Sequence, residues 1–167
     1  MKLLIKQKLF RLTDNFTVYG ENDKIEYLVK GKLISATKKL NIMDANKNLV
    51  AMFRKKVFAL VRTYFIFEEK IKVGKIKKKI FSLFVKKYKI VYKGNEYKLN
   101  GSIFDYDYDV KKGNEIVVSC HKKFFKIADT YVIDYVSDEY KLLAMFITMA
   151  IDVEKATDRK NKQNTKK

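Results

Sequence analysis

The stretch SDEYKLLAMFITMAID, residues 137–152, decides the fold of this 167-residue chain. Ser137 or Asp138 can cap the start of a helix, and the carboxylates of Asp138 and Glu139 suit the positive end of its dipole. The run Leu142–Ile151 that follows does not alternate between apolar and polar residues, as a half-buried strand would. The stretch therefore predicts one long helix.

This predicted helix is apolar on every side. With a rotation of about 100° per residue, its large apolar side chains point in all directions, so they cannot all contact one neighbouring element. A helix of this kind is buried all round. We therefore expect the following side chains to fill the centre of the protein: Leu142, Leu143, Met145, Phe146, Ile147, Met149 and Ile151.

Short apolar runs with period-two alternation fill the chain before the helix, separated by turn-forming clusters. The clearest run is Ile103–Val110, where aromatic residues and valine alternate with Asp105, Asp107 and Asp109. The preceding pair Asn100–Gly101 tolerates the positive φ of a type I′ turn, which predicts a tight hairpin there. The other predicted strands are Leu3–Phe10, Phe16–Tyr19, Ile25–Leu33, Asn48–Phe53, Thr63–Glu68, Lys70–Lys77, Val85–Tyr92, Glu96–Leu99, Glu115–His121 and Thr130–Val136.

Many strands and a single, fully apolar helix leave few architectures. Closing the sheet around the helix buries all of its sides and also removes exposed strand edges. We expect a mainly β (α+β) protein, a closed antiparallel barrel of about twelve strands around a central hydrophobic C-terminal helix. The domain is predicted to span residues 1–156, because the polar and basic composition of residues 157–167 is that of a disordered tail.

A set of short segments occurs in a characteristic order. They are KQKLF (Lys6–Phe10), FTVY (Phe16–Tyr19), YLVKGK (Tyr27–Lys32), LNIMD (Leu40–Asp44), DTYVI (Asp129–Ile133) and the terminal helix ending at Asp152. Together they resemble the LURP-one-related (LOR) family of the tubby C-terminal-like superfamily, which is similar to phospholipid scramblases. The resemblance implies a barrel of about twelve strands threaded by its hydrophobic C-terminal helix.

The resemblance also sets an expectation about ligands. Tubby-like domains are known for binding phosphoinositide headgroups, whereas scramblase-like relatives add an acidic calcium segment and palmitoylated cysteines that do not occur in this chain. No binding position of tubby carries over residue by residue. The resemblance therefore implies a fold, and suggests phospholipid as a class of ligand, without assigning a site.

The chain is strongly basic, with 37 Lys and Arg against 19 Asp and Glu, a formal net charge of +18. Such an excess draws a protein toward polyanions such as nucleic acid or an anionic lipid surface. The charge is nearly all lysine, and Pro and Trp are absent, which is also typical of codon bias. The open alternatives are an anionic membrane, nonspecific nucleic acid, and a purely structural module whose lysines are only solvated surface.

Three features bear on location. The single cysteine, Cys120, cannot form an internal disulfide, and the run Lys2–Phe10 lacks the apolar block of a signal peptide. No apolar run approaches the roughly 18 to 20 residues that cross a bilayer. We expect a cytoplasmic protein without a transmembrane segment. If its positive charge serves lipid binding, we expect it to contact a membrane peripherally.

No arrangement of residues predicts catalysis. The only histidine, His121, adjoins Cys120, but a zinc or thiol site would need further ligands or a base, so both are expected to be structural. The triplet within Asp105–Asp109 fails as an EF-hand loop because Val110 stands where glycine is required, and its carboxylates are expected to pair with lysines on neighbouring strands. Without a GxGxxG, P-loop, HExxH or GxSxG motif, the sequence predicts a non-enzymatic domain with no cofactor and no metal.

The segment Lys70–Lys93 carries ten lysines and no acidic residue. Its apolar residues interleave with the lysines, so we expect one edge on the core and a cationic face in water. Specific recognition of nucleic acid usually uses Arg or exposed aromatics, and only four Arg occur, so anionic lipid with phosphoinositide-like headgroups ranks first. Because the helix fills the barrel, any site is expected on the outer wall or rim. The candidate anion- or lipid-binding residues are Lys75, Lys77, Lys78, Lys79, Lys86, Lys87 and Lys89.

Overall fold

The computed structural model describes residues 1–6, 15–32, 39–78, 88–103, 105–123 and 130–164. Within these ranges the chain forms twelve strands followed by one α-helix, α1 (Lys141–Asn164), which a 3-10 turn at Asp138–Tyr140 introduces. The strands are β1 (Lys2–Lys6), β2 (Phe16–Tyr19), β3 (Ile25–Lys32), β4 (Lys39–Met43), β5 (Leu49–Lys55), β6 (Thr63–Glu68), β7 (Ile71–Lys78), β8 (Tyr88–Tyr92), β9 (Asn95–Ser102), β10 (Asp107–Lys112), β11 (Glu115–Lys123) and β12 (Thr130–Tyr135).

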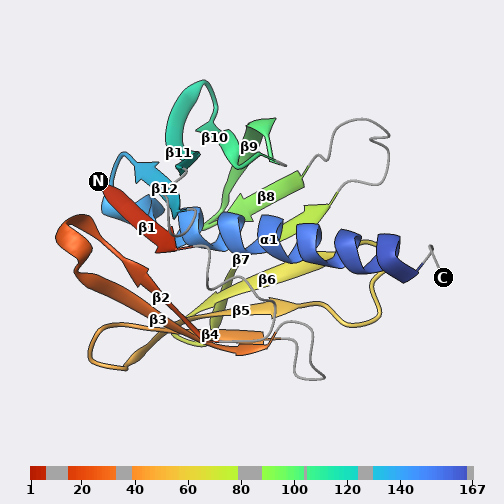
Figure 1. The fold of residues 1–167 in the computed structure, drawn as a ribbon, viewed down its shortest axis with the longest axis horizontal. Helices are drawn as coiled ribbons and strands as arrows, with labels where there is room; N and C mark the ends of the chain where they lie inside the picture. Colours follow the sequence, from red (N-terminus) through yellow and green to blue (C-terminus); the bar gives the residue numbers. More distant parts are fainter. Residues whose placement is uncertain (7–14, 33–38, 79–87, 104, 124–129, 165–167) are drawn as a thin grey trace.

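The strands form a closed antiparallel barrel in which each strand pairs with the next along the chain (Figure 1). The barrel closes where β1 pairs with β12, from Lys2 opposite Asp134 to Lys6 opposite Thr130. This confirms the predicted mainly β fold with a single C-terminal helix. Successive turns of an antiparallel meander alternate between two ends. We call the end at which α1 begins the proximal end, and the end at which it leaves the distal end.

The helix is the centre of the core. Phe146 is fully buried and stacks on Phe53 of β5 with ring centroids 5.7 Å apart, and Phe53 stacks on Tyr64 of β6 at 5.1 Å. Leu142 departs from the prediction, because it lies in the first turn of α1 and packs against the core only from the barrel's edge, partly exposed. The predicted burial is confirmed for Leu143, Met145, Phe146, Ile147, Met149 and Ile151.

Polar side chains of α1 are buried inside the barrel as well. A buried polar group is costly unless it is hydrogen-bonded, and each of these meets a tyrosine hydroxyl from the barrel wall or from the β9–β10 connection. The tyrosines thus fix the rotation of the helix within the barrel. The pairs are Thr148 with Tyr108 (2.9 Å), Asp152 with Tyr106 (2.6 Å) and Glu154 with Tyr64 (3.1 Å).

The predicted hairpin at Asn100–Gly101 is wrong, because both residues lie inside β9 and pair with β10. The connection between these strands instead spans residues 103–106, where the backbone N–H and the carboxylate of Asp105 both bond the Ser102 hydroxyl. The predicted strand Ile103–Val110 is correspondingly shorter at its start. Short Ser and Asp side chains stabilise turns by bonding nearby groups, which explains the displaced turn.

Gly101 is required where it lies. It adopts a φ of 105° inside β9, and a Cβ at this position would lie 2.6 Å from the backbone oxygen of Asp107. We expect Gly101→Ala to lower the free energy of unfolding by about 2 kcal/mol, because an L-residue is strained at this φ and the strands would have to separate. Urea titration measures the loss.

The matched control for this prediction is Gly94→Asn. Gly94 lies in the turn between β8 and β9 with a φ of 77°, and the space around its Cβ position is open. Asparagine tolerates this left-handed conformation, so the control is expected to cost a few tenths of a kcal/mol. An equal loss in both variants would contradict the close-approach explanation for Gly101.

The helix continues to Asn164, past the predicted domain boundary at Ala156. Residues 157–164 are therefore helical where a disordered tail was predicted, while residues 165–167 lie outside the described residues. Once a helix has started, each added residue gains one backbone hydrogen bond, and Lys, Arg and Gln are good helix formers. The lack of apolar residues in this segment indicates that it is not part of the core. It does not by itself end a helix.

Candidate functional site

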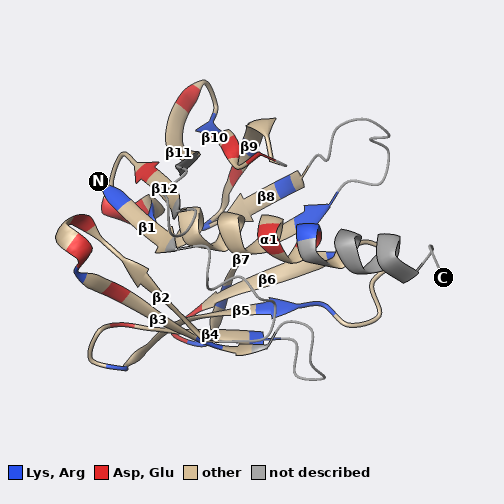
Figure 2. Ribbon diagram, in the orientation of Figure 1, with Lys and Arg blue, Asp and Glu red and all other residues tan. Residues whose placement is uncertain are grey.

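Charge is distributed unevenly between the two ends of the barrel (Figure 2). Around the distal ends of β5 to β8, the described charged side chains on the outer wall are all cationic, and Leu49–Phe67 contains four Lys or Arg and no acidic residue. Most of the described acidic residues instead lie at or near the proximal turns. The proximal carboxylates include Glu21, Asp23, Asp44, Glu69, Glu115, Asp138 and Glu139.

Strand register brings the distal cations together on the outer wall. Residues directly opposite each other on paired strands share a face of the sheet. One row across the wall runs from Lys56, whose N–H bonds the carbonyl of Thr63, through Lys77 to Lys89. The neighbouring row runs from Arg54 through Phe65 to Lys75 and Val91. We call Arg54, Lys56, Lys75, Lys77 and Lys89 the outer basic patch.

The candidate lysines named from the sequence do not all belong to this patch. Lys75 and Lys77 are exposed, and no ion pair between described residues involves either of them. Lys89 is also exposed but pairs with Glu96 at 2.6 Å. The prediction that Lys78 belongs to an outer anion-binding surface is wrong, because its side chain turns to the barrel mouth and bonds Glu154. The candidates Lys79, Lys86 and Lys87 lie outside the described residues.

The charge of Lys70–Lys93 is also better compensated than the sequence indicates. Lys93 pairs with Glu68 at 2.8 Å, in addition to the Lys89 pair with Glu96. Both carboxylates lie outside residues 70–93, on the strands β6 and β9, so the charges of the segment alone do not reveal them. The uncompensated part is therefore smaller than predicted, and among the described lysines it includes Lys75 and Lys77 on the distal half of β7.

Arg54 and Lys56 are patch residues that were not predicted from the sequence. They belong to β5 and to the residue after it, and only the strand register places them beside β7. The guanidinium of Arg54 lies 4.8 Å from the centre of the Phe67 ring, and Lys72 lies 4.4 Å from the centre of Phe65, so cations cover both outer aromatics. The run Arg54-Lys55-Lys56 directly before a non-alternating apolar stretch is the signal that could have found them.

At the barrel mouth the cations meet a buried carboxylate. Glu154 of α1 is 1% exposed and accepts hydrogen bonds from Arg62 Nη1 at 2.6 Å, from Lys78 Nζ at 3.1 Å and from the hydroxyl of Tyr64. Burial, followed by the nearby Glu154 carboxylate, raises the pKa of Tyr64 well above its ordinary value. The cluster joins α1 to β6 and β7, and these charges serve the fold rather than the outer surface.

Cys120 and His121 do not form a common site, because they lie on opposite faces of β11. The Cys120 thiol is fully buried against the helix side, and burial raises its pKa to about 12, which disfavours the thiolate that nucleophilic chemistry requires. His121 is exposed and its Nδ1 lies 2.7 Å from the Asp107 carboxylate. Cys120 therefore contributes to the core, and the structural role expected for His121 stays a prediction.

The aspartates of the β9–β10 region each meet a different partner. Asp107 meets His121, Asp109 accepts a hydrogen bond from Ser119 at 2.6 Å, and Asp105 bonds Ser102. The expected pairing of these aspartates with lysines is not found in the part of the chain that the structure describes. Among the described residues, no group of three or more His, Cys, Asp or Glu is placed to hold a metal ion.

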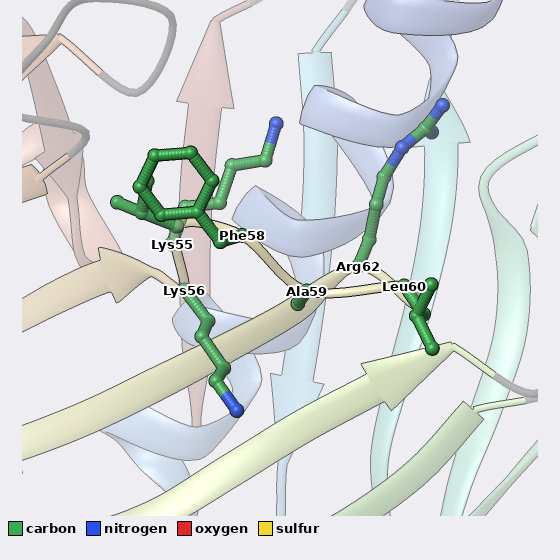
Figure 3. A pocket seen from close by; sticks show the side chains of 7 residues that line it. Lys55, Lys56, Phe58, Ala59, Leu60 and Arg62 are labelled. Atoms are coloured by element: carbon green, nitrogen blue, oxygen red, sulfur yellow. The ribbon is translucent and has the colours of Figure 1, made fainter.

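A hollow of about 420 Å³ lies on the β5–β6 loop, residues 56–62, at the distal end (Figure 3). Within the loop, Phe58 and Leu60 are fully exposed, at 102% and 105%. In the part of the chain that the structure describes, no helix combines the length and the apolar character needed to cross a membrane. The hollow is lined by Lys55, Lys56, Val57, Phe58, Ala59, Leu60 and Arg62.

Comparison with known proteins agrees with this fold. The solved X-ray structure of a protein from Arabidopsis thaliana superposes with a TM-score of 0.63 at 17% identity, over 92% of this chain and 91% of that one. The uncharacterized protein YxjI of Bacillus subtilis is 24% identical over 154 residues, covering 92% of this chain and 93% of its own length. Residues 1–152 match the sequence model of the LURP-one-related (LOR) proteins. The chain therefore belongs to the LURP-one-related family.

Proposed function

We propose that this protein is a non-enzymatic binding domain that associates with an anionic membrane surface through the outer basic patch. The observation that carries the proposal is the cross-strand arrangement of Lys56, Lys75 and Lys77, none of which forms an ion pair with another described residue, while Glu96, the carboxylate on the adjoining strand β9, pairs with Lys89. Pairing of neighbouring strands presents several such charges on one face of the barrel wall at once. Each lysine near an anionic surface contributes about 1 kcal/mol, so the patch as a whole supports salt-sensitive recruitment.

Lipid is favoured over nucleic acid by the state of the aromatic side chains in the patch. Binding of single strands commonly uses exposed rings on which bases stack. The rings of Phe65 and Phe67 are only partly exposed, and Lys72 and Arg54 already cover them. The remaining contribution to binding is electrostatic attraction, which the headgroups of any anionic lipid, including phosphoinositides, can provide.

We expect Lys75→Glu combined with Lys77→Glu to weaken binding to anionic vesicles at least about 30-fold, because about 2 kcal/mol of attraction is lost and repulsion is added. The measurement is co-sedimentation of nuclease-treated protein with neutral and with anionic vesicles at about 0.15 M salt, where loose charge attraction is largely screened. Selective pelleting of the wild-type protein with anionic vesicles is the expected starting point.

The control is Lys98→Glu combined with Lys111→Glu. These lysines are cross-strand partners on β9 and β10, so the control changes the net charge equally on a different part of the wall. Equal weakening by both pairs would show that only net charge matters and would remove the patch from the proposal. If the wild-type protein does not bind anionic vesicles but copurifies with nucleic acid, the proposed function is wrong and nonspecific nucleic-acid binding replaces it.

A further inference from the structure

The β5–β6 loop presents apolar side chains to water at the distal rim. Phe58 and Leu60 have relative exposures of 102% and 105%, and the neighbouring Val57 is 41% exposed. Apolar side chains stabilise a fold when they are buried. Because Phe58 and Leu60 are exposed, they contribute almost nothing to the stability of the folded protein. Exposed aliphatic and aromatic side chains gathered on one loop are a feature of surfaces that bind something else.

The backbone of the loop supports the same conclusion. Phe58 has a φ of 54°, in the left-handed region that bulky L-residues rarely adopt. Such a conformation has a cost, and here burial of the ring does not offset it. The loop therefore holds the phenyl ring out in water against both its backbone preference and the hydrophobic effect.

A cation without an ion-pair partner among the described residues adjoins this apolar tip. Lys56 directly precedes Val57 and Phe58, and Figure 3 shows its side chain leaving the loop in the direction opposite to that of Arg62, whose guanidinium is bound to Glu154. Lys56 also begins the outer row that continues to Lys77. Lys56 therefore places an amine one step behind the apolar tip, an order that suits a membrane surface, where apolar groups insert and amines stay at headgroup level.

We infer that the β5–β6 loop inserts Phe58 and Leu60 into the interfacial region of an anionic lipid surface while the outer basic patch contacts the headgroups. The inference rests on the proposed function and adds to it an apolar contribution that salt does not screen. Lipid is the occupant that suits both side chains, because a phenyl ring could stack on a nucleic-acid base but the branched aliphatic chain of Leu60 could not.

A single tryptophan tests the insertion directly, since the chain contains none. Phe58→Trp is expected to shift its fluorescence emission to shorter wavelength on anionic vesicles and to be quenched by lipids brominated on their acyl chains. The control is Ile71→Trp, at an apolar position that is 67% exposed at the proximal end. Its emission is expected to stay unchanged although the protein pellets equally well.

The outcomes separate the two proposals. If both variants pellet with anionic vesicles and Phe58→Trp emission does not respond, insertion is refuted while the basic patch stands. If neither variant pellets, the proposed function and the insertion fail together. A response of Phe58→Trp to a single-stranded oligonucleotide but not to vesicles would overturn insertion in favour of base stacking.

Removal of the apolar tip gives a second, quantitative test. Phe58→Ser combined with Leu60→Ser is expected to weaken vesicle binding about 100-fold, given the transfer free energies of the two side chains. Wild-type binding is expected to persist in part at about 1 M salt, where charge attraction is largely screened, and the double variant is expected to detach. Equal residual binding of the two proteins at that salt concentration would contradict insertion.

Discussion

Replacing Phe146 with alanine is expected to lower the free energy of unfolding by about 3 to 5 kcal/mol, a loss comparable to the total stability of a marginal domain. The ring is fully buried at the centre of α1 and stacks on Phe53, which stacks in turn on Tyr64. Its removal leaves a cavity bounded by helix and wall, and a closed barrel cannot collapse to fill it. Thermal and urea unfolding measure the loss.

The chain offers a matched control in Phe58→Ala. The chemical change is the same, but Phe58 is fully exposed, so the effect on stability is expected to stay within about 0.5 kcal/mol. A loss below about 1 kcal/mol for Phe146→Ala would mean that α1 does not fill an enclosed core. If the variant does not fold at all, Phe146→Leu, which retains most of the volume, supplies a measurable intermediate.

The second large effect concerns the cluster at the barrel mouth. Arg62→Met combined with Lys78→Met is expected to destabilise the protein by about 3 kcal/mol, because a carboxylate is left in the interior without its cations. Glu154 is 1% exposed, and its remaining described hydrogen bond comes from the Tyr64 hydroxyl. Methionine keeps the length of the side chains, so the loss reports on charge more than on packing.

Adding Glu154→Gln to this double variant separates charge from shape. The amide oxygen can still accept the hydrogen bond from Tyr64, but no net charge remains in the interior. We expect the triple variant to recover at least about 1 kcal/mol relative to the double variant. A triple variant that is no more stable than the double would show that the cations act through packing alone.

The helix and the barrel could be predicted because a single physical requirement determines both. A helix that is apolar on every side must be surrounded by other parts of the chain, and in this sequence only alternating strands can surround it. Details set by local competition were not predictable in the same way. The Asn100–Gly101 pair favours a turn, yet the Ser102–Asp105 interaction places the turn later. The short strand β4, with Leu40 and Ile42 buried, was not among the predicted strands, because five residues give only a brief alternation.

The candidate site was less predictable, because register assembles it from separate segments. Lys75 and Lys77 alternate along one strand and could be named in advance, whereas Arg54 and Lys56 join them only through the pairing of β5 with β6 and of β6 with β7. The inward turn of Lys78 depends on Glu154, which lies 76 residues away in the chain. Composition cannot report such a partner.

Closure of the barrel between its first and last strands has a consequence for how the protein is made. Lys2 pairs with Asp134, and α1, which fills the interior, follows every strand in chain order. A ribosome delivers the chain from its N-terminus, so the apolar inner wall and the free edge of β1 stay without partners until nearly all of it has emerged. Such non-local topologies fold slowly and are prone to aggregate in their incomplete forms. We therefore expect the nascent chain to depend on chaperones that shield it until the helix arrives.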